Sequence, residues 1–202
     1  MFVEDLIGNT PLVEVRHINT NPNVKIYCKL EGQNPGGSVK DRAAYGMISG
    51  ALNRGDIKKG DKLVEATSGN TGIALAMISR LLGLEMNLIM PDSATAERVK
   101  SMEAYGAKVI LTPAEQTIEH SRKVAEEMAE SGEYFMLNQF GNADNYKAHY
   151  KTTGPEIFKD TDGKITHFVS AMGTTGTIMG VSKYLKEQTP KIEIVGTQPT
   201  DG

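Results

Sequence analysis

The feature that most constrains this sequence is a regular alternation, after Gly60, of short apolar segments with stretches of helical periodicity. Segments with the composition of strands occupy residues 62–66, 86–90, 108–111, 166–170 and 192–197. Helices are predicted at residues 71–82, 96–105, 113–131 and 175–187. Alternation of this kind requires parallel strands joined by right-handed crossovers. The predicted fold class is therefore α/β, with helices packed on parallel sheets.

Two local patterns add detail to this prediction. Residues 112–115 combine a capping-box pattern with proline at the first helical position, and Gly132 follows the predicted end of the same helix. Nearer the N-terminus, residues 24–30 alternate apolar and polar side chains, which predicts a half-buried strand. This pattern places Cys28 on the core-facing side, where we expect a buried hydrophobic side chain and not a nucleophile.

The composition excludes several classes of protein. The 202-residue chain has 22 Lys and Arg against 25 Asp and Glu, a net charge of −3, and no basic cluster, so no nucleic-acid partner is expected. Its one cysteine excludes a disulfide framework. The N-terminus lacks the pattern of a signal peptide, and charged residues interrupt the most apolar region, residues 72–90, so no membrane span is expected. These features together predict a cytoplasmic protein.

Two loops rich in Gly, Ser and Thr follow predicted strands and precede predicted helices, at residues 67–72 and 173–177. In parallel α/β sheets, ligands bind at such positions. Glycines permit close backbone approach, and a helix N-terminus supplies unpaired N–H groups for an anion. Each loop alone is equally compatible with a simple strand-to-helix turn, but two such long loops in one chain favour two small anion sites.

Spacing separates these loops from the common nucleotide-binding motifs. Neither loop carries the lysine of a P-loop, and the dinucleotide motif Gly-x-Gly-x-x-Gly does not occur in the sequence. The sequence therefore disfavours ATP and NAD as ligands. The 4 histidines lack metal-ligand spacing, and Ser68 is not part of a nucleophile elbow, so neither a metal site nor a serine hydrolase is predicted.

Lys40 is a third candidate, because it follows the breaker-rich loop at residues 33–38 and precedes the apolar helical stretch 43–52. The positive end of a helix dipole and burial would both lower the pKa of Lys40. The resulting neutral amine can attack a carbonyl to form a Schiff base. Asp41 is expected to oppose this shift, and a single lysine is far more often a solvated surface residue. From the residues alone, both interpretations stay open.

Taken in order, these motifs resemble the cysteine synthase family of pyridoxal-phosphate enzymes, which have the tryptophan-synthase-β type of fold. The resemblance covers essentially the whole chain and rests on IGNTPL at residues 7–12, NPGGSVKDR at 34–42, EATSGNTGIA at 65–74 and TTGPE at 152–156. Within the family, residues 172–177 and 196–199 are closer to the B type of O-acetylserine sulfhydrylase than to the A type.

The resemblance implies pyridoxal 5′-phosphate as cofactor. It also implies a reaction that eliminates acetate from O-acetylserine and adds sulfide to give cysteine, with thiosulfate as a second sulfur donor. Lys40 would form the Schiff base and remove the substrate's α-proton, and Asn70 would hydrogen-bond the cofactor's ring oxygen. The cofactor phosphate would be bound by Gly173, Thr174, Thr175, Gly176 and Thr177. The amino-acid carboxylate would be bound by Thr67, Ser68, Gly69, Thr71 and Gln139.

The resemblance further implies two αβα units built on parallel sheets. The smaller unit, residues 38–145, would carry the substrate loop, and the larger, residues 1–37 and 146–202, would carry the phosphate loop. Because the family continues beyond position 202 into a segment that faces the cofactor's pyridine nitrogen, we expect a C-terminally truncated form with an incomplete larger unit. The implied partners are an amino acid, a sulfur donor and a second copy in a homodimer, without nucleic acid or membrane.

Alternative functions within the same chemistry are those of cystathionine β-synthase and of serine/threonine dehydratase, because Lys40 and both loops would serve any of them. An alternative from another class is a truncated fragment that binds the cofactor or a partner without catalysis.

Overall fold

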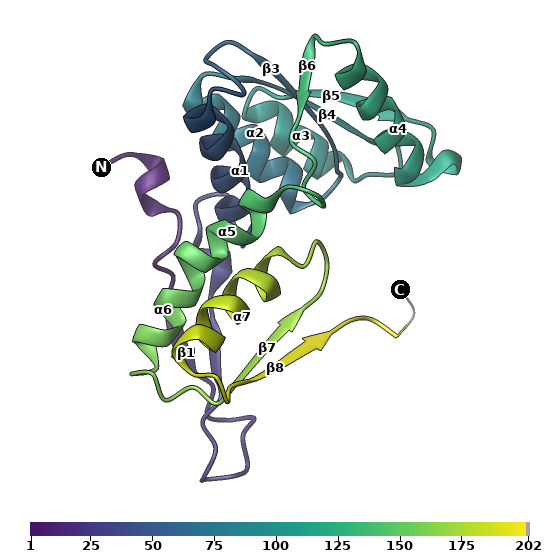
Figure 1. Ribbon diagram of the computed structural model, residues 1–202. Helices are drawn as coiled ribbons and strands as arrows, with labels where there is room; N and C mark the ends of the chain where they lie inside the picture. Colours follow the sequence, from purple (N-terminus) through teal and green to yellow (C-terminus); the bar gives the residue numbers. More distant parts are fainter. Residues whose placement is uncertain (201–202) are drawn as a thin grey trace. The chain divides into compact units, whose positions relative to one another are not determined.

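The computed structural model describes residues 1–200, which divide into two compact units (Figure 1). One unit consists of Met1–Arg42 and the chain from Asn145 onward, and the other consists of Ala43–Asp144. The helices α1 (Lys40–Arg54) and α5 (Ala143–Lys151) each span one of these boundaries in the sequence. The functional roles expected for the two units stay a prediction.

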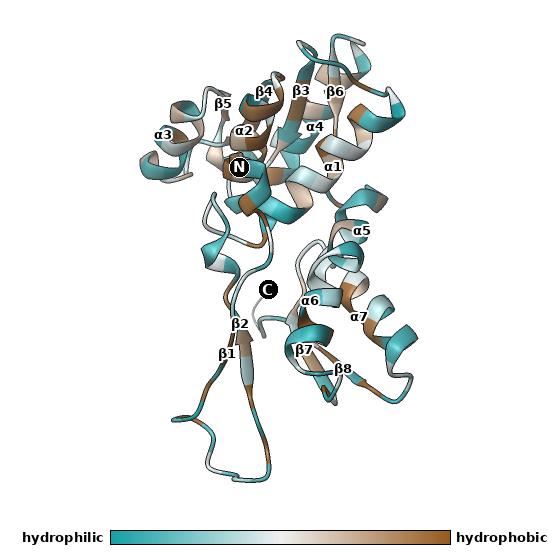
Figure 2. Cartoon of the chain, turned by 90° about the vertical axis from the view of Figure 1, so that its left-hand side faces the viewer, coloured by the Kyte–Doolittle hydropathy of each residue, from teal (hydrophilic) through white to brown (hydrophobic). Residues whose placement is uncertain are grey.

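The unit Ala43–Asp144 is built on a four-stranded parallel sheet. Its strands lie in the order β5 (Lys108–Thr112), β4 (Glu85–Pro91), β3 (Lys62–Ala66) and β6 (Tyr134–Met136). Figure 2 shows β3 and β4 in the colour of hydrophobic residues, as is typical of central parallel strands that are buried on both faces. The predicted α/β class with a parallel sheet is confirmed.

Helices α2 (Asn70–Leu82), α3 (Ala96–Ala104) and α4 (Thr117–Glu130) connect the strands of this sheet. α4 packs on one face of the sheet, where a buried cluster consists of Val64, Ala66, Ile89 and Ala125. Because side chains alternate along a strand, Leu63 and Glu65 point to the opposite face. Both are buried, so the interior on that side contains a carboxyl group.

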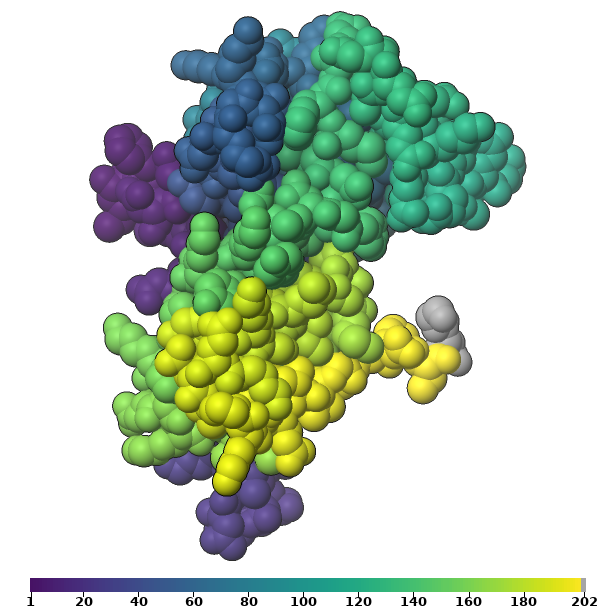
Figure 3. Space-filling model, in the orientation of Figure 1, coloured from purple at the N-terminus to yellow at the C-terminus, as the bar shows by residue number. Residues whose placement is uncertain are grey.

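The other unit contains two small sheets. β1 (Leu12–Glu14) and β2 (Tyr27–Lys29) form an antiparallel ribbon, whereas β7 (His167–Ala171) and β8 (Glu193–Thr197) pair in parallel. Helix α6 (Thr153–Asp160) packs against α7 (Gly176–Gln188), and the buried core beneath them consists of Ile157, Val181, Leu185 and Ile192. In Figure 3 the yellow atoms of α7 and β8 lie side by side on the surface of this unit.

The prediction for Cys28 is wrong. Cys28 is exposed, and so are Val24, Ile26 and Leu30, which were expected to face a core with it. Strand β2 is shorter than the predicted segment 24–30 and, within residues 1–200, pairs only with β1. The alternating side chains of this ribbon therefore have no core within the described chain to pack against.

The helix predicted at residues 113–131 begins later than expected. Pro113 has a ψ of 129°, outside the helical region, and a 3-10 turn, Ala114–Gln116, precedes α4. The predicted capping box does not form, because Thr112 is the last residue of β5 and its Oγ1 lies 2.7 Å from Ser121 Oγ in the core. The end of the helix is as predicted, since Gly132 follows it with a φ of +77°.

Some elements were not predicted at all. Strand β6 has three residues, and helices α5 and α6 have nine and eight residues, so each is too short to show a sustained hydrophobic period. Two further 3-10 turns, Val3–Leu6 and Glu31–Gln33, lie in the N-terminal segment. Among the helices of residues 1–200, none has both the length and the apolar character that crossing a membrane requires.

Candidate active site

Lys40 is the first residue of α1. Its backbone N–H donates to Ser38 Oγ at 3.1 Å, and the preceding loop turns at Gly37, which has a φ of +84°. The side chain is half-buried, and this burial lowers the pKa of Lys40. A lowered pKa favours the neutral amine that Schiff-base formation requires.

The neighbouring Asp41 side chain holds the glycine-rich loop. The Gly36 N–H donates to Asp41 Oδ2 at 2.5 Å, and a Cβ on Gly36 would lie only 2.6 Å from Asp41 Oδ1. Burial raises the pKa of Asp41 to about 6, although the bond from Gly36 lowers it. Asp41 thus fixes the backbone that leads into α1, which explains why glycine is needed at position 36.

Arg42 is the centre of a buried network of charges. Its guanidinium donates two bonds to Glu31, from Nε at 2.7 Å and Nη2 at 2.8 Å, and two to Glu156, from Nη1 at 2.6 Å and Nη2 at 2.7 Å. Lys29 Nζ adds a contact to Glu156 at 2.8 Å. Burial alone would raise the pKa of Glu156, but the bonds from Arg42 and Lys29 lower it to about 2.

This network joins three segments that are distant in the sequence. Thr10 Oγ1 donates to Glu31 at 2.7 Å, and the backbone N–H of Asn9 donates to Glu156 Oε1 at 3.0 Å. The motifs at residues 7–12, 34–42 and 152–156 therefore meet at Arg42, two positions after Lys40. Sequence reasoning assigned no role to Arg42, Glu31 or Glu156, although the first and last lie in the quoted motifs.

The loop predicted to bind the substrate follows β3 and leads into α2, which begins at Asn70. Thr67 and Thr71 are buried, Ser68 and Gly69 are half-buried, and Asn70 is exposed. The structure brings Thr71 and Gln139 together, because Thr71 Oγ1 donates to Gln139 Oε1 at 3.0 Å. Two residues 68 positions apart in the sequence are thus hydrogen-bonded to each other, and their shared role in binding a carboxylate stays a prediction.

The loop predicted to bind phosphate follows β7 and ends at Gly176, the first residue of α7. Asn145 Nδ2 donates to Thr174 Oγ1 at 3.1 Å, and Thr175 Oγ1 donates to the Thr174 carbonyl at 2.7 Å. A Cβ on Gly176 would lie 2.0 Å from Asn145 Oδ1, so the loop packs too closely for any side chain there. The Thr175 hydroxyl also binds within the loop, because it donates to the Thr174 carbonyl.

His149 lies behind this loop and was not identified from the sequence. It is 1% exposed, with Nδ1 2.9 Å from Thr153 Oγ1 and Nε2 3.3 Å from Thr177 Oγ1. Burial, with the charges of Arg42 and Lys40, lowers the pKa of His149 to about 4, so the ring is neutral at pH 7. His149 thus contacts Thr177 and is close enough to Lys40 to respond to its charge.

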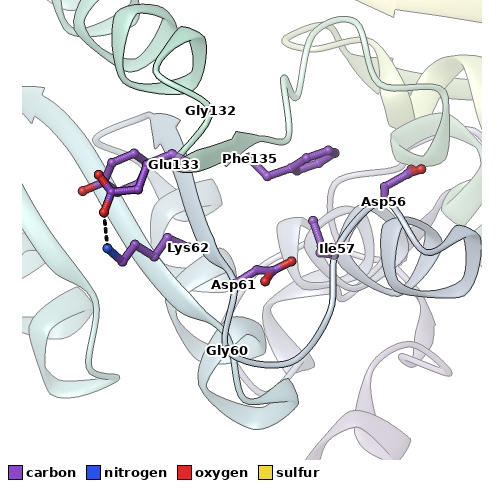
Figure 4. A pocket seen from close by; sticks show the side chains of 9 residues that line it. Asp56, Ile57, Gly60, Asp61, Lys62, Gly132, Glu133 and Phe135 are labelled. Atoms are coloured by element: carbon purple, nitrogen blue, oxygen red, sulfur yellow. Dashed lines mark hydrogen bonds and ion pairs between the residues drawn. The ribbon is translucent and has the colours of Figure 1, made fainter.

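A separate pocket lies at the other end of the parallel sheet (Figure 4). It has a volume of about 380 Å³, and the ion pair between Lys62 and Glu133 lies beside it. It is lined by Asp56, Ile57, Gly60, Asp61, Lys62, Gly132, Glu133, Tyr134 and Phe135. None of the predicted site residues lines this pocket, which is next to the first residues of β3 and β6.

Comparisons with known proteins show the family to which the chain belongs. The sequence pattern of the family described as "Pyridoxal-phosphate dependent enzyme" matches residues 3–202. Cysteine synthase B of Pseudomonas aeruginosa is 56% identical over 200 residues, which are 99% of this chain and 67% of that protein. Cysteine synthase B of Escherichia coli is also 56% identical over 200 residues, with 99% of this chain and 66% of that protein covered.

Solved structures give the same result. A hydrogen sulfide-producing enzyme from Fusobacterium nucleatum superposes with a TM-score of 0.92 at 46% identity, covering 98% of this chain and 67% of that one. Cysteine synthase from Entamoeba histolytica has a TM-score of 0.94 at 40% identity, covering 98% of this chain and 60% of that one. The chain therefore belongs to the pyridoxal-phosphate-dependent enzymes, in the cysteine synthase family. It spans about two thirds of the length of the curated relatives it matches.

The residues present fit the cofactor of this family, pyridoxal phosphate. Lys40 has the lowered pKa that a Schiff-base lysine needs. The loop before α7 joins a helix N-terminus to threonine hydroxyls, and the close packing at Gly176 fixes its backbone, as a phosphate cradle requires. Among residues 1–200, no cluster of three or more His, Cys, Asp or Glu side chains could hold a metal ion.

Proposed function

We propose that this chain carries the machinery of a cysteine synthase, which replaces the acetoxy group of O-acetylserine by a sulfur nucleophile. Acetate leaves the β-carbon and sulfide adds there, giving cysteine; thiosulfate is a second candidate donor, whose addition gives S-sulfocysteine. The observation that carries the proposal is that Lys40, whose pKa is lowered by burial, lies in the same unit as the phosphate loop, whose Thr177 contacts the buried His149. The relatives named cysteine synthase support the choice of reaction.

The bound cofactor supplies an electron sink for the substrate's Cα carbanion. Lys40 would hold the cofactor through its Nζ, and the amine, once the substrate's amino group has displaced it from the cofactor, would accept the α-proton. The loop Gly173, Thr174, Thr175, Gly176 and Thr177 binds the phosphate through backbone N–H groups and hydroxyls. Asn70 would donate to the ring oxygen, and the substrate carboxylate would be bound by Thr67, Ser68, Gly69, Thr71 and Gln139.

The unit Ala43–Asp144 then acts as the substrate unit, and the other unit binds the cofactor. We also propose that the protein works as a cytoplasmic homodimer, on small molecules alone. Sedimentation velocity of the purified chain tests the assembly, since a species of twice the chain mass is expected.

The test of the reaction is cysteine formation by the purified chain loaded with pyridoxal phosphate. O-acetylserine with sulfide should give cysteine and acetate in equal amounts, and Lys40→Ala should abolish the reaction. The matched control is Lys123→Ala, because Lys123 is 71% exposed on α4. Turnover of homocysteine with serine, or release of ammonia from serine or threonine, would instead identify the cystathionine β-synthase or dehydratase alternatives. A chain that binds the cofactor but turns over none of these substrates is the cofactor-binding fragment.

A second candidate reaction is the release of sulfide. It is favoured by the likeness to a hydrogen sulfide-producing enzyme at 46% identity. Sulfide release from cysteine, measured with the same preparation, distinguishes it from synthesis.

A further inference from the structure

Glu65 is a buried carboxyl group that the reaction above does not use. It lies in β3 and is 2% exposed. The register of the sheet pairs the preceding residue, Val64, with Met136, which is the last residue of β6. Glu65 therefore stands level with the point at which the neighbouring strand leaves the sheet.

The Glu65 carboxyl binds the backbone that follows β6. The N–H groups of Asn138 and Gln139 donate to it, together with the N–H of Ala66. Asn138 has a φ of +55°, and its carbonyl accepts from the N–H groups of Gly141 at 3.0 Å and Asn142 at 2.9 Å. Because β6 has ended, the sheet no longer offers partners for these two N–H groups, and the Glu65 carboxyl takes that place.

The same turn carries Gln139, whose side chain is bound at its other end. Gln139 is 6% exposed, and Thr71 Oγ1 donates to its Oε1 at 3.0 Å. The backbone of Gln139 is thus held by β3 and its amide by the first turn of α2. Both strand and helix flank the loop from Thr67 to Gly69.

We propose that Glu65 is a positioning residue: it anchors the backbone of Asn138 and Gln139 and so holds the Gln139 amide against Thr71 for the substrate carboxylate. The anchoring of the Asn138 and Gln139 backbone by Glu65 does not depend on the reaction. The effect of this anchoring on the substrate carboxylate rests on the proposed function.

The second oxygen of the Glu65 carboxyl disfavours a full negative charge on this side chain. Glu65 Oε2 is buried and has no hydrogen-bond partner among the described residues. Burial raises the pKa of Glu65 to about 7, although the backbone bonds and the charge of Arg122 lower it. Because burial raises its pKa, the Glu65 carboxyl can accept the backbone N–H groups with less negative charge beside an incoming carboxylate.

Two substitutions separate anchoring from burial. Glu65→Leu removes the acceptor and leaves two N–H groups unpaired, whereas Glu65→Gln keeps an amide oxygen at the same distance along the side chain. Asn87→Leu is the matched control, because Asn87 is a buried polar residue of the next strand whose Nδ2 donates to the Leu63 carbonyl at 3.1 Å. If Glu65→Leu does not fold, Glu65→Asp serves instead, since its carboxyl is one methylene too short.

The first readout is hydrogen exchange of the Asn138 and Gln139 amides in the chain without cofactor. Exchange should accelerate by at least about tenfold in Glu65→Leu, as expected for a lost buried hydrogen bond. It should stay slow in Glu65→Gln and in Asn87→Leu. Unchanged exchange in Glu65→Leu, or equal acceleration in the glutamine variant, overturns the anchoring.

The second readout is the kinetics of the loaded chain. The KM for O-acetylserine should rise in Glu65→Leu by at least about tenfold with kcat changed much less, and Glu65→Gln should restore it. Accelerated exchange with an unchanged KM overturns the substrate part alone. Failure of the parent chain to form cysteine contradicts the proposed function, while the exchange result still decides the anchoring.

Discussion

Arg42 and Glu156, 114 positions apart in the sequence, form a two-point ion pair with Nη1–Oε1 at 2.6 Å and Nη2–Oε2 at 2.7 Å. The Arg42 side chain is 1% exposed, and its remaining edge binds Glu31. This pair fixes the first turn of α1 to α6 within one unit. The position of Lys40 therefore depends on a buried charge network as well as on the glycine-rich loop.

Removing Arg42 should be strongly destabilising. Arg42→Met leaves Glu31 and Glu156 as partly buried charges without their main partner, and we expect a loss of up to about 3 kcal/mol in the free energy of unfolding. Urea denaturation followed by circular dichroism measures this loss. Arg16→Met, which removes a 77% exposed arginine beside Glu14, should change the midpoint little. Equal effects of the two substitutions would contradict the account of the network.

The titration of Glu65 should make stability depend on pH. Its folded pKa of about 7 lies above the ordinary value of 4.5, so the folded state binds the extra proton between these values. The stabilisation is complete below pH 4.5 and is lost as the pH rises through about 7. The difference in the free energy of unfolding between Glu65→Gln and the parent should therefore shift in favour of the variant from pH 5 to pH 8, by at most about 3 kcal/mol. The control is Glu103→Gln, which replaces an exposed glutamate of α3.

The phosphate loop should lose its ligand when Gly176 gains a side chain. In Gly176→Val the added Cβ meets Asn145 Oδ1 at 2.0 Å, so the loop must shift. We expect weaker binding of pyridoxal phosphate, measured by absorbance titration. Gly32→Ala in the same unit, where an added Cβ has no neighbour nearer than 4.0 Å, should bind normally. Normal cofactor binding by Gly176→Val would assign the phosphate elsewhere.

Ser68→Ala should instead affect the substrate. Loss of a charge-assisted hydrogen bond to the carboxylate costs about 1–3 kcal/mol, which corresponds to a KM for O-acetylserine raised about 5- to 150-fold. The cofactor should stay bound. Ser131→Ala, at an exposed serine after α4, provides the comparison. If Ser68→Ala released the cofactor and left KM unchanged, the roles of the two loops would be reversed.

The sequence predicts the parts of the fold that depend on local pattern. β3 and β4 are recognisable because central parallel strands are apolar on both faces. Both candidate loops are recognisable because they are rich in Gly, Ser and Thr and directly follow strands. β6 has three residues and no period of its own, so only its pairing with β3 reveals it. Cys28 shows the opposite error, because it was predicted to be buried and is exposed. Alternating side chains predict a strand with one apolar face, but they do not show whether a core covers that face.

The candidate site likewise contains residues that the sequence identifies and residues that only the structure identifies. Lys40 and the two loops stand out by their residue types and by their places beside strands and helices. The roles of Arg42, His149 and Glu65 depend on partners elsewhere in the chain, such as Thr177, 28 positions from His149. No spacing rule reports such contacts, and each becomes visible only when burial and hydrogen bonds are known.

Lys40 is the residue that holds pyridoxal phosphate in the proposed function. The measurement is reduction of the cofactor-loaded chain with sodium borohydride, followed by proteolysis and mass spectrometry of the phosphopyridoxyl peptide. The lowered pKa of the half-buried Lys40 amine predicts a single adduct on the peptide that contains residues 34–42. An adduct on any other lysine, or no stable adduct in a chain that binds the cofactor, would contradict the central claim.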